Sequence, residues 1–228
     1  MSDLGFGLLQ LVLFIPAIVL HEVAHGYVSY RLGDPTAKAM GRLSLNPLKH
    51  IDPFGTVLLP ILLAFSGMPV FGYAKPVPIN PGYYQDHRKG VLLSGFAGPA
   101  TNLVLAILAG LAARAIGMGA GFASGFVSDG ALTGLAWAFY VVYFFANINL
   151  VLMFFNLIPI PPLDGSSFIP LFLDDRKLRK YYEFERYGMA ILLGLLLLAP
   201  RLLGFNPISA YFSVTVDPLL ALLTGLSL

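Results

Sequence analysis

The residues of this sequence with the clearest chemical potential lie in the run LHEVAHG, which contains His21, Glu22 and His25. Residues four apart lie on the same face of an α-helix, so the two imidazoles can reach one Zn²⁺ ion. Glu22 follows the first histidine directly and can serve as a general base toward a water molecule. The spacing therefore predicts a metal-dependent hydrolytic centre on a helix, with one zinc ion per chain.

A catalytic zinc ion takes three protein ligands, so a third ligand must come from elsewhere in the chain. The candidates are His50, His87, Asp164 and Asp217. We favour Asp164, near the end of the run FNLIPIPPLDG, whose prolines end a helix and favour an extended backbone. The orientation predicted below places this end on the cytoplasmic side, level with His21 and His25. Asn156, near the start of that run, can donate a hydrogen bond to a developing oxyanion. His50 and His87 are more typical of solvated or capping histidines, and Asp217 of a residue at a helix kink.

The composition is that of a membrane protein. Of the 228 residues, 57% are hydrophobic and only 11% are charged, whereas an average soluble domain carries roughly 25% charged residues. Ionisable groups inside a membrane-spanning helix are costly and usually functional, which strengthens the case for the motif. The net charge of +2 provides no electrostatic case for binding nucleic acid, and the absence of cysteine excludes thiolate ligands.

The apolar stretches predict a single all-α polytopic membrane domain over residues 1–228, with five to six transmembrane helices. These stretches are residues 4–30, 54–71, 91–116, 132–158, 187–203 and 208–228. The catalytic core is expected over about residues 4–165 and a C-terminal helical pair over about residues 187–228. The second stretch is shorter than the others and is interrupted by Pro60, Gly67 and Pro69.

The distribution of Lys and Arg predicts the orientation. Residues 31–49, 73–89 and 164–186 are rich in basic side chains and should be cytoplasmic, whereas residues 117–130 contain none and should be external. Both flanks of residues 54–71 are basic, so we interpret this stretch as a re-entrant element or membrane-embedded hairpin. An ordinary short span is the alternative. At ~1.5 Å per residue from Gly5, His21 lies roughly 24 Å into a ~30 Å hydrocarbon core, near the cytoplasmic side.

The HEVAH motif in an apolar helix, paired with the distal Asn-x-x-Pro-x-Pro-x-x-Asp-Gly motif, resembles the site-2 protease family of intramembrane zinc metalloproteases. FAGPATN adds Gly98 and Asn102, which match the family's Gly-x-x-x-Asn pattern. The resemblance covers about residues 4–165. Neither a PDZ module nor a CBS pair is present in the sequence, so the chain resembles a minimal form of the family. It implies zinc at His21, His25 and Asp164 with Glu22 as base. It also implies that residues 41–81 correspond to a membrane-associated β-hairpin region.

The family's activity implies the partners and the location. The expected substrate is a transmembrane protein, such as a membrane-tethered regulator, cleaved within or next to its membrane segment in regulated intramembrane proteolysis. The expected location is the cell membrane of a prokaryote. Two other functions remain open: a metal-ion transporter that uses the same ligands, and a non-catalytic protein that retains membrane clients. Glu22 argues against the transporter, because transport needs no general base. The presence of Glu22, Asn156 and Asp164 together argues against the non-catalytic protein, because an inactive relative is free to lose any of them.

Overall fold

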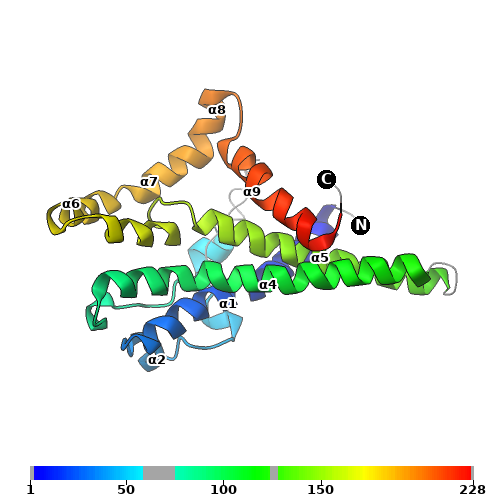
Figure 1. Cartoon of the computed structure of the whole chain (residues 1–228), viewed down its shortest axis with the longest axis horizontal. Coiled ribbons are helices and arrows are strands. Elements are labelled where there is room, and N and C mark those ends of the chain that lie inside the picture. The colour runs from blue at the N-terminus through cyan, green and yellow to red at the C-terminus, as the bar shows by residue number, and fades with distance from the viewer. Residues whose placement is uncertain (1–2, 59–74, 124–127, 227–228) are drawn as a thin grey trace. The chain divides into compact units, whose positions relative to one another are not determined.

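The computed structural model of the protein describes residues 3–58, 75–123 and 128–226, and the regular elements in these ranges are all helices (Figure 1). The chain divides into two compact units. One comprises Met1–Ala17 and Pro99–Leu228, and the other comprises Ile18–Gly98. Two long helices, α1 (Asp3–Arg31) and α4 (His87–Ala123), contribute residues to both units. The prediction of an all-α fold is confirmed.

The larger unit is built on α4, α5 (Asp129–Asn156) and α9 (Pro207–Thr224). Small and aliphatic side chains of these three helices form its buried core, which contains Ala106, Ala109, Ala146, Leu150, Met153, Val216 and Leu220. α9 packs against α5, as the red and yellow-green helices show (Figure 1), and the Tyr211 hydroxyl donates to the Phe154 carbonyl at 3.2 Å. Small residues at such contacts let helices approach closely where lipid supplies no hydrophobic drive.

The ends of these helices follow from capping and proline chemistry. The Ser128 hydroxyl accepts a hydrogen bond from the Ala131 N–H at the start of α5, and the Asn206 side chain accepts two at the start of α9. α9 ends at Thr224 and is capped by Gly225, whose φ of 73° suits a residue without a side chain. α5 ends at Asn156, three residues before Pro159, because proline cannot continue the helical hydrogen bonding.

Between α5 and α9 the chain forms shorter elements. These are the 3₁₀-helix η4 (Asp164–Phe172), α6 (Asp175–Glu185), α7 (Gly188–Leu193), the π-helix η5 (Gly194–Leu198) and α8 (Ala199–Leu203). We expected an extended backbone after the prolines; instead, residues 157–163 form turns and bends, and Asp164 opens η4. The physical reason is a local hydrogen bond from the Leu163 N–H to the Ile160 carbonyl at 2.9 Å, which closes the chain into a turn.

The smaller unit contains the second half of α1, the first part of α4 and four short helices between them. The short helices are α2 (Thr36–Ala39), η1 (Pro47–Lys49), η2 (Pro53–Leu58) and η3 (Pro81–Tyr83). A fully buried carboxylate, Asp34, organises the turn after α1. It accepts hydrogen bonds from the Ser29 hydroxyl, the Thr36 N–H and the Asn80 N–H, which together replace its hydration.

Four helices in the described residues are long and apolar enough to cross a membrane: Leu9–Arg31, His87–Phe122, Asp129–Asn156 and Pro207–Thr224. The pair Asp175–Glu185 and Gly188–Leu203, bent by 60°, gives a fifth candidate if it counts as one span. Five spans is the number predicted when residues 54–71 do not cross. The protein is therefore an integral membrane protein.

The predicted re-entrant element is not confirmed. Residues 54–58 belong to η2, while residues 59–71 lie outside the described part of the chain. Within residues 41–58 and 75–81 there is no strand, so the β-hairpin implied by the family resemblance is not seen there.

Candidate metal centre and active site

His21 and His25 lie one turn apart on α1 and face each other. Their Nε2 atoms are 3.0 Å apart, and their ring planes meet at 83°. Both side chains are buried, with 4% and 7% of their surface exposed. The four-residue spacing of the motif thus places two imidazole nitrogens at one point, as the sequence predicted.

The orientation of His25 is set by a backbone group of α4. Its Nδ1 atom lies 2.6 Å from the Ser94 carbonyl oxygen. A carbonyl can only accept, so Nδ1 carries the proton, and in the neutral ring the lone pair is on Nε2. A backbone carbonyl bound to the outer nitrogen is typical of metal-binding histidines, because it holds both the tautomer and the ring plane.

Gly98 leaves the space that the two imidazoles occupy. A Cβ atom at this position would collide with His25 Nε2 and lie 2.6 Å from His21 Nε2. Any larger residue on this turn of α4 would therefore displace the rings. The sequence indicated Gly98 through the Gly-x-x-x-Asn pattern, but not its physical role.

The histidine pair fits a zinc ion. Two nitrogen ligands at the usual ~2.05 Å in a tetrahedral site lie about 3.3 Å apart, close to the 3.0 Å between the two Nε2 atoms. The rings are buried on a span candidate, where unligated imidazoles facing each other would be costly. The donor chemistry and the separation both suit zinc.

Glu22 is half-buried beside this pair, and its carboxylate is bound by the segment that follows residue 74. Its Oε2 atom accepts a hydrogen bond from the Val77 N–H at 2.9 Å. The contact joins residues 55 positions apart and could not be read from the sequence. It leaves the second oxygen, Oε1, to act on another group.

Asp164 and Asn156 belong to the larger unit. Asp164 is the first residue of η4, and Asn156 is the last residue of α5. A Cβ on Gly165 would collide with the Leu157 carbonyl, so the Asp-Gly turn lies tightly against the end of α5. The Asn156 amide donates to the Leu152 carbonyl at 2.9 Å, which uses one of its two N–H groups. Their roles as third ligand and oxyanion donor stay predictions.

Asn102 ties three helices of the larger unit together. Its amide donates to the Asn149 side-chain oxygen at 2.8 Å and to the Ala17 carbonyl at 3.5 Å, and it is fully buried. This links α4 to α5 and to α1, one turn before His21. Nothing in the sequence singled out Asn149, because a lone asparagine in an apolar helix carries no motif.

The structure also places the three other candidate ligands, His50, His87 and Asp217. The His50 Nε2 donates to the Ser44 carbonyl at 2.8 Å within the smaller unit. His87 is exposed at the start of α4, with Nδ1 3.3 Å from the Pro81 carbonyl. Asp217 lies within α9, directly before Pro218. The exposed position of His87 agrees with the interpretation of a solvated histidine, whereas His50 is buried, with 2% of its surface exposed, and lies at the C-terminal cap of η1.

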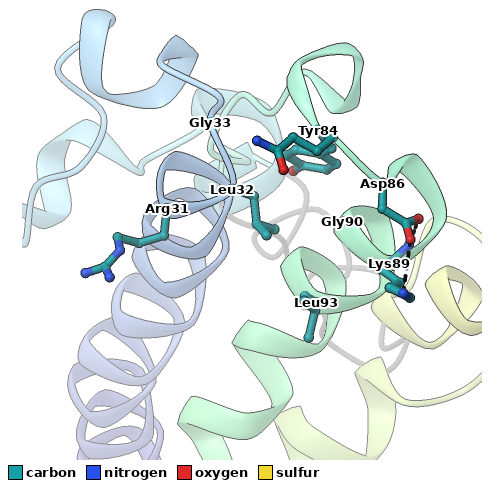
Figure 2. Close-up of a pocket in the computed structure, with 9 residues that line it drawn as sticks. Arg31, Leu32, Gly33, Tyr84, Asp86, Lys89, Gly90 and Leu93 are labelled. Carbon is teal, nitrogen blue, oxygen red and sulfur yellow. Dashed lines mark hydrogen bonds and ion pairs between the residues drawn. The ribbon is translucent and has the colours of Figure 1, made fainter.

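A pocket opens where α1 ends and α4 begins. Arg31, Leu32, Gly33, Tyr84, Lys89 and Leu93 are among the residues that line it (Figure 2). Lys89 forms an ion pair of 3.3 Å with Asp86, and both side chains are largely exposed. The pocket contains neither His21 nor His25 and is not part of the candidate metal centre.

Comparison with known proteins identifies the family. The model of Peptidase family M50 matches residues 9–199, which include both predicted metal motifs. A Bacillus subtilis protein named "Putative zinc metalloprotease YwhC" is 38% identical over 222 residues, covering 92% of this chain and 93% of the relative. "Putative zinc metalloprotease Rip2" of Mycolicibacterium smegmatis is 29% identical over 212 residues, covering 89% and 71%. No solved structure matches the chain.

The matched region contains the paired histidines of α1, whose separation suits zinc, and the Asp-Gly turn at the start of η4. The apolar helices place this machinery in a membrane protein. The chain therefore belongs to Peptidase family M50, the site-2 protease family of membrane zinc metalloproteases.

Proposed function

We propose that the protein is an intramembrane endopeptidase that hydrolyses a peptide bond within or next to a transmembrane segment of another membrane protein. The carrying observation is the placement of His21, Glu22 and His25 on an apolar span, with both imidazoles buried. We further propose a cytoplasmic-side active site in a prokaryotic cell membrane, and a membrane-tethered regulator as substrate. The distribution of basic side chains and the family support these proposals.

Each residue has a distinct role in this proposal. His21, His25 and Asp164 would hold zinc, which supplies Lewis acidity at the scissile carbonyl when bound. Ser94 holds the His25 ring through Nδ1. Glu22, held at Oε2 by Val77, takes the proton of the attacking water at Oε1 and passes it to the leaving amine. Asn156 donates its second amide N–H to the developing oxyanion.

A helical substrate presents no free carbonyl, because each one is hydrogen-bonded within its own helix. The substrate must therefore unwind locally before cleavage. Glycine or proline near the cleavage site lowers the cost of unwinding by about 1 to 3 kcal/mol. We expect cleavable segments to contain such residues.

The test is Glu22→Gln in proteoliposomes with a transmembrane peptide substrate. Glutamine still accepts the Val77 N–H but is not a base, so we expect about one zinc per chain and a cleavage rate at least ~10²-fold lower. Glu183→Gln, an exposed change on α6, is the matched control and should cleave normally.

Three outcomes separate the candidate functions. Cleavage by Glu22→Gln within tenfold of the wild type would show that Glu22 is not the base. Zinc uptake into the vesicle lumen without cleavage would favour a transporter. Retention of the peptide without turnover in the wild type would favour a client-binding protein.

A further inference from the structure

Residues 75–80, which we call the strap, contain no regular secondary structure and contact Glu22 of α1 within the smaller unit. Three of their N–H groups donate inward. The Lys75 N–H binds the His50 carbonyl at 2.8 Å, the Val77 N–H binds Glu22 Oε2 at 2.9 Å, and the Asn80 N–H binds Asp34 Oδ2 at 2.7 Å. The strap is thus attached at both ends and at the predicted catalytic carboxylate.

Arg42 holds the first half of the strap. Its Nη2 donates to the Lys75 carbonyl at 2.9 Å and to the Pro76 carbonyl at 3.3 Å. The side chain is buried, with 9% of its surface exposed, and in the described part of the chain both of its partners are these carbonyls. Burying a guanidinium without a carboxylate is costly. In this position the Arg42 side chain fixes the two successive peptide groups directly before Val77.

Val77 seats the strap on α1. A Cβ on Gly26 would lie 2.5 Å from Val77 Cγ1 and 2.8 Å from Leu43 Cδ2, so the Val77 side chain rests against the bare backbone of Gly26. Gly26 is four residues after Glu22, one turn further along the same face. Val77 therefore contacts α1 through its side chain and binds the Glu22 carboxylate through its backbone N–H.

We propose that Arg42 is a positioning residue for peptide hydrolysis: it fixes the strap so that the Val77 N–H holds Glu22 Oε2 and directs Oε1 toward the attacking water. This rests on the proposed function, in which Glu22 is the base. Among the described residues, the hydrogen bonds of the Arg42 side chain go to backbone carbonyls of the strap, so it acts on Glu22 through Val77. A displacement of the carboxylate by about 1 Å is enough to cost ~10²-fold in rate.

The experiment compares Arg42→Ala and Arg42→Lys with the wild type in proteoliposomes. We expect Arg42→Ala to lower kcat by about 30- to 100-fold, with KM within threefold and one zinc per chain. Lysine keeps a cation that can donate to both carbonyls, so Arg42→Lys should recover kcat to within about fivefold. Arg201→Ala, an exposed arginine on α8, is the control for loss of a positive charge.

A disulfide gives an independent measurement. The sequence contains no cysteine, and Gly26→Cys with Val77→Cys places two Cβ atoms near the ~3.8 Å separation that a disulfide needs. In the Arg42→Ala background, oxidation should raise kcat at least ~10-fold, and reduction with a phosphine should reverse it. If Arg42→Ala does not purify folded, the pair in the otherwise native chain is used, and its oxidised form should cleave at least as fast as its reduced form.

The outcomes are distinguishable from failure of the proposed function. If wild type and Glu22→Gln cleave alike, the proposed function fails first. Suppose that Glu22→Gln is inactive, and that Arg42→Ala is folded, carries zinc and has the wild-type kcat. Arg42 then has no positioning role. If the oxidised cysteine pair is inactive and reduction restores cleavage, the strap must move during turnover, and the proposal is overturned.

Discussion

The Nδ1 atom of His25 lies 2.6 Å from the carbonyl oxygen of Ser94, a residue 69 positions later in the chain. The contact ties α1 to the first part of α4 at the predicted metal ligand itself. Because the acceptor is a backbone group, the hydrogen bond depends on how closely the two helices approach. Gly98, one turn beyond Ser94, is the residue that permits this approach.

Gly98→Ala should therefore disrupt the histidine pair. The new methyl group would collide with His25 Nε2 and crowd His21 Nε2, so the rings must rotate away from the geometry that suits zinc. We expect zinc affinity to fall about 10- to 100-fold, which is typical when the support of a metal ligand is lost. The measurement is zinc per chain by mass spectrometry after dialysis against a graded chelator.

Gly119→Ala is the matched control on the same helix, because its Cβ would meet no atom within 4 Å. It should keep its zinc and gain up to about 1 kcal/mol of helix stability. Equal zinc affinity in the two variants would contradict the role given to Gly98.

The ligand assignment predicts that His21→Ala, His25→Ala and Asp164→Ala each lose most of their zinc. Two remaining ligands hold the metal weakly, since a catalytic site needs three protein donors. His87→Ala, an exposed histidine at the start of α4, should retain about one zinc per chain and controls for non-specific loss. Normal zinc content in Asp164→Ala would remove Asp164 from the ligand set, and His50 would be tested next.

Asp34→Asn should destabilise the protein in a pH-dependent way. Burial by itself would raise the pKa of Asp34, but the hydrogen bonds from Asn80, Thr36 and Ser29 outweigh it and hold the pKa below its usual value. A lowered pKa stabilises the fold above the unfolded pKa of about 3.9, and this stabilisation is lost as the pH falls through the folded value.

The expected loss at neutral pH is about 2 kcal/mol, the scale of buried hydrogen bonds to a charged group. Thermal unfolding of metal-free wild type and Asp34→Asn in detergent provides the measurement. The difference between their Tm values should be largest at pH 6 to 7 and should shrink below about pH 4. A difference that stays constant from pH 7 to pH 3 would contradict the ionised state of Asp34.

The predicted topology can be tested with single cysteines at Lys49, Arg88 and Ala120. The Lys75 N–H binds the His50 carbonyl, so the chain before and after the predicted membrane-embedded stretch meets at one place. Arg88 and Ala120 lie near opposite ends of α4, about 48 Å apart along its axis, enough to cross the membrane. An impermeant thiol reagent should label Lys49→Cys and Arg88→Cys from one side, proposed to be cytoplasmic, and Ala120→Cys from the other.

Labelling of Lys49→Cys and Arg88→Cys from opposite sides would mean that residues 54–71 form a true span. It would also reverse the direction of α1 relative to the later helices. The assignment of Asp164 to the zinc site would then be wrong, because the two motifs would reach opposite halves of the membrane.

Much of this protein could be predicted from local patterns. Apolar runs of span length determine where α1, α4, α5 and α9 lie, because a helix is the way to satisfy backbone groups in lipid. The four-residue spacing of His21 and His25 determines that their imidazoles share a face, since helix geometry depends only on neighbours along the chain. The family resemblance, confirmed by the M50 match, rests on the same short motifs.

The residues that hold the site in place are brought there by contacts between segments far apart in the sequence. Ser94 binds His25, Val77 binds Glu22, and Arg42 holds the strap, yet none of these residues belongs to a motif. Both contacts to the motif use a backbone group of the distant residue, which every residue carries, so residue type could not reveal them. The turn that opens η4 was likewise decided by one hydrogen bond between Leu163 and Ile160, where the prolines alone favoured extension. Local chemistry thus determined which groups react, and only tertiary packing determined what holds them in place, because that depends on which distant backbones meet.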